Sequence, residues 1–200
     1  MQAPKLLNKR AEDFLAEFHQ AQVHLGTATT TESANNWQPP PVSKFKLNFD
    51  AVVFIDLGWS GMGVIIHNKK GEVMGAMSTK GSRVTDSLEA EALAYHNALK
   101  FAMDIGFSDI FIEGDCVQVI NAIEASKANL PRLGHAVEDI QALISGLRWV
   151  EVRWVKRSAN LVAHSLARNA KNISNDVIWF EDSSPLALES LYHDYLAIME

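Results

Sequence analysis

Apolar residues occupy every second position from Leu47 to Val53, and the positions between them are mostly polar. Successive side chains of a strand point to opposite faces, so this alternation predicts a strand over residues 46–53 with one apolar face. Asp50 falls on its polar face. The first strand is therefore expected to carry a carboxylate on the side opposite its apolar packing.

Two further strands are predicted immediately after the first, over residues 61–67 and 72–79. The segment Asn68–Gly71 between them has the composition of a tight turn. Connections this short join antiparallel neighbours. The first three strands are therefore expected to form an antiparallel meander.

The spacing of apolar residues changes to a helical period from Asp86 onwards. Asp86 followed by Glu89 is a helix-capping pattern. The pattern predicts helices over residues 86–105, 115–125, 131–147 and 161–170, with strands over 109–113 and 149–155. Strands separated by helices are expected to be parallel. The chain is thus predicted to be an α/β domain with a five-stranded mixed sheet flanked by helices.

The first 42 residues have a different character. Residues 6–25 have apolar positions at helical spacing, and residues 27–36 form a polar linker. Three consecutive prolines, at 39–41, are incompatible with a helix or a central strand. We therefore expect an N-terminal amphipathic helix and a proline-rich linker over residues 1–42, and a domain with a C-terminal extension over 43–200.

Composition narrows the class of protein. The chain is 48% hydrophobic and 21% charged, which is typical of a globular protein. A single cysteine, Cys116, excludes an intrachain disulfide and a cysteine-based zinc site. The net charge of −6 argues against coating nucleic acid by bulk charge. With no apolar run of membrane-spanning length and no signal-peptide pattern, we expect a nuclear or cytoplasmic protein that is neither secreted nor in a membrane.

Three acidic residues occupy unusual positions. Asp50 lies within a strand, where Asp is rare. Glu91 lies on the apolar stripe of its predicted helix, and Asp115 follows Gly114 at the carboxyl end of a strand, where sites form in α/β sheets. Each has a simpler explanation as well: an exposed sheet face, a stripe edge that reaches water, or a helix N-cap. Together they could bind one or two Mg²⁺ ions, which prefer oxygen ligands.

Five short motifs, in this order along the chain, resemble a type 1 ribonuclease H domain, specifically the plant reverse-transcriptase-like subfamily. The resemblance runs from Trp37 to the C-terminus. It implies a ribonuclease H-like fold, which is a mixed sheet whose first three strands are antiparallel. The motifs are the Trp-Gln-Pro-Pro-Pro run leading to Lys46–Asp50, Ser60–Ile66 with Gly71–Val73, Glu89–Ala94, Phe111–Asp115, and Arg157–Ala167.

The resemblance implies hydrolysis of the RNA strand of an RNA–DNA hybrid, with two Mg²⁺ ions expected and Mn²⁺ possible. Water would attack in line at phosphorus and leave a 3′-hydroxyl and a 5′-phosphate. The family's catalytic and metal-binding carboxylates correspond to Asp50, Glu91 and Asp115, and His164 stands at its fourth acidic position. Substrate contacts are implied for Ser60, Arg157 and Asn160. Recognition is expected to rest on shape, sugar hydroxyls and phosphates.

Two departures from the family pattern leave an alternative open. The wider family has Asp where this chain has His164, and commonly Gly where it has Ala51. A neutral imidazole weakens Mg²⁺ binding and favours softer ions such as Mn²⁺ or Zn²⁺. The alternative is a catalytically weak or inactive, retroelement-derived nucleic-acid-binding or interaction domain. A proofreading-type exonuclease is disfavoured. Such an enzyme requires Asp-x-Glu on its first strand, whereas this chain has Val52 two positions after Asp50.

Overall fold

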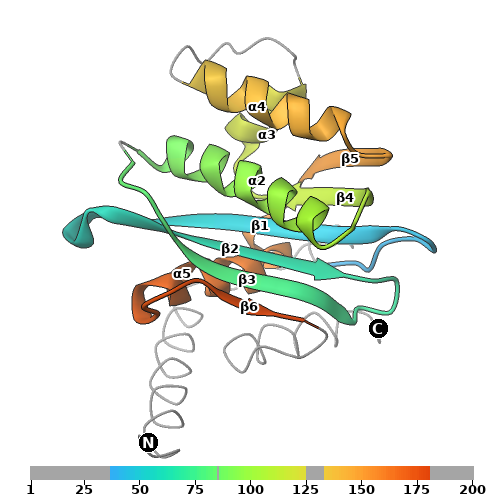
Figure 1. Cartoon of the computed structure of the whole chain (residues 1–200), viewed down its shortest axis with the longest axis horizontal. Helices are drawn as coiled ribbons and strands as arrows, with labels where there is room; N and C mark the ends of the chain where they lie inside the picture. The colour runs from blue at the N-terminus through green and yellow to red at the C-terminus, as the bar shows by residue number, and fades with distance from the viewer. Residues whose placement is uncertain (1–36, 85, 125–132, 181–200) are drawn as a thin grey trace, which may run out of the picture. The chain divides into compact units, whose positions relative to one another are not determined.

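The computed structural model describes residues 37–84, 86–124 and 133–180. The predicted helix over 6–25 and residues 181–200 of the C-terminal extension lie outside this part of the chain. The strands are β1 (Phe45–Phe54), β2 (Trp59–His67), β3 (Val73–Gly81), β4 (Asp109–Gly114), β5 (Trp149–Trp154) and β6 (Val177–Trp179). The α-helices are α2 (Ser87–Asp104), α3 (Val117–Glu124), α4 (Gly134–Ser145) and α5 (Leu161–Asn169). Figure 1 shows their arrangement.

One mixed sheet organises the domain, in the order β5-β4-β1-β2-β3-β6. The meander of β1, β2 and β3 is antiparallel, and β1, β4 and β5 are parallel neighbours, so the predicted mixed sheet is confirmed. The predicted number of five strands is wrong by one. The sixth strand, β6, pairs antiparallel with β3. It has only three residues, too few for alternation to reveal it.

Helices cover both faces of this sheet. In Figure 1, α2 lies over one face with α3 and α4 beyond it, whereas α5 lies on the other face. The α2 face contains the larger apolar core, which includes Leu47, Phe49 and Tyr95, all 0% exposed. On the opposite face, Ile65 of β2 packs with Leu166 of α5. The alternation of β2 therefore supplies apolar residues to two separate layers, whereas β1 supplies them to the α2 face.

Two glycines of β2 allow α5 to approach the sheet closely. A Cβ atom on Gly63 would lie 2.1 Å from the carbonyl oxygen of Ala163, and one on Gly61 would lie 2.2 Å from that of Ala167. Neither position can carry a side chain without moving the helix. The same approach lets Asn160, just before α5, donate from Nδ2 to the backbone oxygen of Phe49 at 2.9 Å. The start of α5 is thus held beside the residue that precedes Asp50.

The ends of the elements follow local sequence signals. Asp86 caps α2 by accepting a hydrogen bond from the backbone N–H of Glu89 at 2.9 Å, as predicted. Trp37 is 2% exposed and donates from Nε1 to Oδ1 of Asn48 at 3.1 Å. The packed region therefore includes Trp37, which lies before the expected domain start near Ser43.

Among the helices of residues 37–84, 86–124 and 133–180, none is both long and apolar enough to cross a membrane.

Candidate active site

The carboxylates of Asp50, Glu91 and Asp115 come together at one place in the fold. Each offers an oxygen atom, and these three atoms all lie within 4.8 Å of one another. Asp50 comes from the middle of β1, Glu91 from the first turns of α2, and Asp115 from the residue after β4. The structure therefore brings together the three acids that the sequence singled out.

Local packing explains how the three elements converge. A Cβ atom on Gly114 would lie 2.5 Å from the ring of Phe49, so only glycine lets the end of β4 come this close to β1. The backbone N–H of Ala51 donates a hydrogen bond to the Glu91 carboxylate, which links α2 to the strand that carries Asp50. Asp115 is thus held by a glycine contact and Glu91 by a backbone hydrogen bond.

Burial makes this group of acids electrostatically unfavourable by itself. Asp50 is 0% and Glu91 7% exposed. Burial, followed by the nearby charges of Asp50 and Asp115, raises the pKa of Glu91 to about 9. Burial and the Asp50 charge likewise raise the pKa of Asp115 to about 6. Glu91 therefore keeps at neutral pH a proton that an isolated carboxyl group would lose, and Asp115 loses its proton at a higher pH than usual.

Arg157 supplies a positive charge beside these acids. It lies in the short 3-10 helix Arg157–Ala159 between β5 and α5. Its Nε is 2.5 Å from Oδ2 of Asp115, and its Nη1 is 3.3 Å from Oδ2 of Asp50. The sequence predicted Arg157 as a substrate contact; its place between two of the acids was not foreseen, since it depends on contacts between segments far apart in the chain.

His164 also contacts Asp50. Its Nδ1 lies 2.6 Å from Oδ2 of Asp50, and Nη1 of Arg157 comes close to the same nitrogen. An imidazole nitrogen can donate or accept but cannot do both, and a guanidinium only donates. If Nδ1 donates to Asp50, it cannot accept from Arg157. His164 therefore lies beside Asp50 and competes with Arg157 for one oxygen, and its role as a fourth metal ligand stays a prediction.

Ser60 and Asn160 make internal hydrogen bonds in this structure. The Ser60 hydroxyl donates to the backbone oxygen of Ser82 at 3.1 Å, and Ser60 is 0% exposed. Asn160 is 1% exposed and joins Phe49 and Asn48. Direct substrate contact by Ser60 or Asn160 thus stays a prediction, while their observed contacts hold the backbone around the site.

A buried polar network beside the site was not predicted. The Nζ of Lys46 lies 2.6 Å from Oε1 of Glu113, and both side chains are almost fully buried. Asn48 donates to Glu113 at 3.2 Å and to Asn160 at 3.3 Å. The one available signal was that Lys46 and Asn48 share the strand face of Asp50. We expected that face to be polar; it is polar but buried.

The donor set fits a hard divalent cation. Oδ1 of Asp50 and Oε2 of Glu91 are buried and have no hydrogen-bond partner among the described residues. Unpartnered buried carboxylate oxygens are costly unless a proton or a cation satisfies them. Asp50, Glu91 and Asp115 would hold such an ion through oxygen. His164 could add nitrogen only through an unprotonated ring atom.

Comparison with known proteins shows which family and which solved structures this domain resembles. A family model described as reverse transcriptase-like matches residues 48–170. RNase H1 from the halophilic archaeon Halobacterium salinarum NRC-1 is 25% identical, with a TM-score of 0.60, over 65% of this chain and 98% of that one. The N-terminal RNase H domain of a Mycobacterium tuberculosis protein, fused to maltose-binding protein, is 24% identical, with a TM-score of 0.58, over 64% and 94%.

LC11-RNase H1, isolated from compost by a metagenomic approach, is a third similar structure, and it was solved in complex with an RNA/DNA hybrid. It is 19% identical, with a TM-score of 0.58, over 64% of this chain and 96% of that one. No curated protein sequence matches the chain significantly. Since the family match spans more than half of the 200 residues, and the sheet and its helices agree with these structures, the chain belongs to the reverse transcriptase-like family and has the ribonuclease H fold.

Proposed function

We propose that this protein is a metal-dependent endonuclease that hydrolyses the RNA strand of RNA–DNA hybrids. The observation that carries the proposal is the convergence of Asp50, Glu91 and Asp115 from three elements, with ligand atoms within 4.8 Å of one another. A protein of similar structure, LC11-RNase H1, was crystallised in complex with an RNA/DNA hybrid, which supports this substrate class.

In this proposal, Asp50, Glu91 and Asp115 hold Mg²⁺ or Mn²⁺, with two ions expected and His164 near them. When bound, the ions would supply polarisation of the scissile phosphate and activation of the attacking water. The residues of the chain position these carboxylates and exclude bulk water from Asp50, which is 0% exposed. Arg157, half-exposed at the same site, is the proposed contact to a substrate phosphate.

Charge distribution supports a site that relies on few basic residues. Several basic side chains pair with acids of the same chain: Lys46 with Glu113, Arg153 with Glu151, and Arg148 with Asp109. The net charge of −6 is therefore not offset by a broad basic surface formed by these residues. Cations bound by the three acids would supply positive charge where the phosphate lies.

The test is a cleavage assay on an RNA–DNA hybrid with the RNA strand labelled, in Mg²⁺ and then in Mn²⁺, beside Asp50→Asn. We expect cleavage of the RNA strand only, and a loss of about a thousandfold or more in Asp50→Asn, since removing one ligand charge costs several kcal/mol of transition-state stabilisation. Asp139→Asn, an exposed residue of α4, is the matched control and should cleave normally.

A second candidate is a nucleic-acid-binding domain without catalysis. The observation that favours it is that His164 contacts Oδ2 of Asp50 together with Arg157, although the family pattern has an acid at position 164. Hybrid binding without cleavage in either metal, by a folded protein, would support this alternative. Equal cleavage by wild type and Asp50→Asn would show that the proposed site is wrong.

A further inference from the structure

Arg157 contacts the same carboxylates that the proposed function assigns to divalent cations. Its Nε lies 2.5 Å from Oδ2 of Asp115, and its Nη1 lies 3.3 Å from Oδ2 of Asp50. The guanidinium thus bridges a residue that follows β4 and a residue in the middle of β1. These are two of the three acids whose ligand atoms lie within 4.8 Å of one another.

A guanidinium and a divalent cation cannot use these oxygens together. Mg²⁺ and Ca²⁺ bind oxygen at about 2.0–2.6 Å, so an ion that bridges Asp50 and Asp115 would fall against Arg157. Two positive groups at that separation repel each other strongly in a partly buried site. Arg157 and a cation therefore exclude each other at these two Oδ2 atoms, and a cation held by the other oxygens of the three acids would still be repelled by the guanidinium.

The exposure of Arg157 would allow its side chain to leave the site. Its side chain is 51% exposed, whereas those of Asp50 and Asp115 are 0% and 7% exposed. The guanidinium therefore reaches the acids from the solvent side, and rotation about its own side-chain bonds would remove it.

Backbone contacts hold the segment that carries Arg157 in place. The N–H of Asn160 donates to the backbone oxygen of Arg157 at 3.0 Å, and the N–H of Val155 donates to that of Gly114 at 3.0 Å. The side chain can thus move while its loop remains fixed, on the fast timescale of exposed rotamers.

We propose that Arg157 is a built-in competitor of the catalytic cation. Without a cation, its guanidinium neutralises Asp50 and Asp115; cation binding displaces it toward solvent, where it is free to pair with a phosphate of the substrate. The inference rests on the proposed metal-dependent function and adds to it a residue that sets cation affinity and links it to substrate binding.

The first experiment measures Mn²⁺ affinity of the full chain by titration in an electron paramagnetic resonance spectrometer. Arg157→Gln removes the competing charge and should bind Mn²⁺ about fivefold more tightly, the effect expected from losing a partly exposed ion pair. Arg153→Gln is the matched control, because Arg153 pairs with Glu151 outside the site. It should bind Mn²⁺ as the wild type does.

A charge-preserving variant separates charge from folding. Arg157→Lys keeps one positive charge but lacks the planar fork that spans two carboxylates. Its Mn²⁺ affinity should fall between those of the wild type and Arg157→Gln. Circular dichroism spectra of all variants establish that the fold is intact.

A second readout follows Arg157 directly in the wild-type protein. The Nε–H resonance of Arg157 is identified by its absence from the spectrum of Arg157→Gln. During a titration with Mg²⁺, which is diamagnetic, this resonance should move to the position of a solvent-exposed arginine and its hydrogen exchange should accelerate. A purely structural arginine would show neither change.

The outcomes separate this inference from the proposed function. If Arg157→Gln binds Mn²⁺ no more tightly than the wild type, or if saturating Mg²⁺ leaves the Arg157 resonance in place, the competition is refuted while metal dependence stands. If neither the wild type nor any variant binds Mn²⁺, the proposed metal site itself fails and the inference fails with it.

Discussion

The Nδ1 of His164 lies 2.6 Å from Oδ2 of Asp50, although the two residues are 114 positions apart. The contact joins α5 to β1 across the face of the sheet where Gly61 and Gly63 let the helix approach closely. The histidine at the family's fourth acidic position is therefore in contact with one of the three acids. Its chemistry depends on which ring nitrogen carries the proton.

Replacing His164 with an acid should strengthen the binding of Mg²⁺. His164→Asp would add an oxygen ligand beside Asp50, and Mg²⁺ prefers oxygen to imidazole. We expect an affinity gain of roughly tenfold, higher Mg²⁺-dependent cleavage, and lower stability without metal because another like charge joins the acids. Isothermal titration with Mg²⁺ tests this. His135→Asp, fully exposed on α4, is the control; an unchanged titration in His164→Asp would place residue 164 outside the metal site.

The stability of the metal-free protein should fall as pH rises, because of Glu91. Its pKa is about 9 in the fold and ordinarily 4.5, so the folded state binds more protons between these values. Stability then decreases with pH across that window. Glu91→Gln cannot ionise, so at pH 8 it should melt several degrees above the wild type, and the difference should shrink toward pH 5.

Thermal melts at pH 5 and pH 8 in the presence of a chelator measure this difference. Asp139→Asn, at an exposed position of α4, is the control and should show no pH-dependent change. A melting difference between Glu91→Gln and the wild type that is equal at both pH values would contradict the raised pKa of Glu91.

The close approach of α5 to the sheet should depend on Gly63. In Gly63→Ala, the new Cβ would lie 2.1 Å from the backbone oxygen of Ala163, so the helix must move. Overpacking of this kind costs about 3 kcal/mol or more, and it would also displace Asn160 and His164 from β1. Urea denaturation and Mn²⁺ titration should both detect the change.

Gly134→Ala is the control for this prediction, because a Cβ at Gly134 would meet no atom within 4 Å. Its unfolding free energy should stay within about 1 kcal/mol of the wild-type value. A Gly63→Ala protein with wild-type stability would show that α5 does not need this contact.

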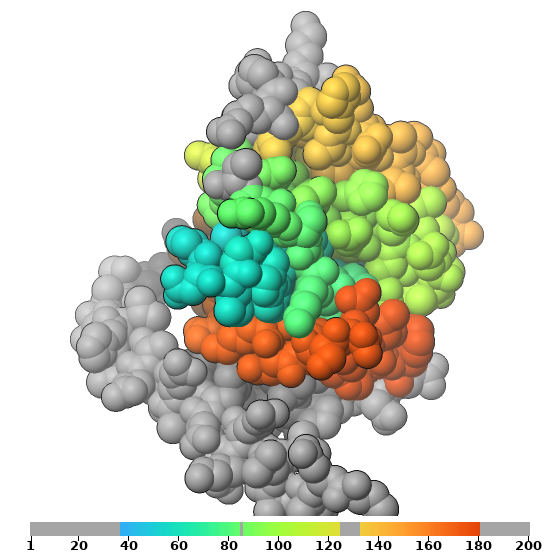
Figure 2. Space-filling view, turned by 60° about the vertical axis from the view of Figure 1, so that its left-hand side comes forward, coloured from blue at the N-terminus to red at the C-terminus, as the bar shows by residue number. Residues whose placement is uncertain are grey.

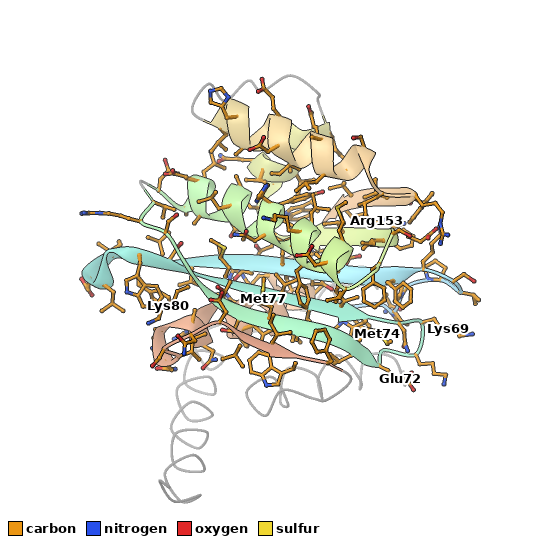
Figure 3. All side chains as sticks on the ribbon, in the orientation of Figure 1. Lys69, Glu72, Met74, Met77, Lys80 and Arg153 are labelled. Carbon is orange, nitrogen blue, oxygen red and sulfur yellow. The ribbon has the colours of Figure 1, made fainter. Side chains whose placement is uncertain are left out.

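Hybrid binding should weaken as salt concentration rises, because contacts to phosphates release counterions. Lys80 and Lys69 are exposed lysines at opposite ends of β3, and Figure 3 shows this separation. Lys80 pairs across the sheet with Gly61, close to the register position of Asp50, whereas Lys69 lies in the distant turn. In Figure 2 the β1–β2 turn (cyan) lies at the surface between the β3–α2 connection (green) and the region of α5 and β6 (orange).

We therefore expect Lys80→Gln to reduce the slope of log affinity against log salt by about one, and Lys69→Gln to leave it unchanged. Fluorescence anisotropy of a labelled hybrid, measured between low and moderate salt, gives both slopes. An affinity that does not depend on salt would contradict recognition through phosphates.

Local patterns predicted most of the fold. Strict alternation identified β1, the capping pair of Asp86 and Glu89 identified the start of α2, and the helical stripe placed Glu91 in the interior. Each of these signals acts within a few residues, through strand pleating, a cap hydrogen bond or helical periodicity. The sixth strand was missed because three residues carry no such period.

The sequence by itself determined the sheet type, the order of elements and the three acids, since these follow from local backbone preferences and from motifs in a fixed order. Only the tertiary structure decided that Arg157 lies between Asp50 and Asp115, that His164 meets Asp50, and that Lys46 is buried against Glu113. These contacts join residues far apart in the chain. They form because β1 is central in the sheet, with β2 and β4 on its two sides, and because α5 packs on the glycines of β2. The spacing of apolar residues along the chain cannot predict contacts of this kind, since it reports only the local backbone conformation.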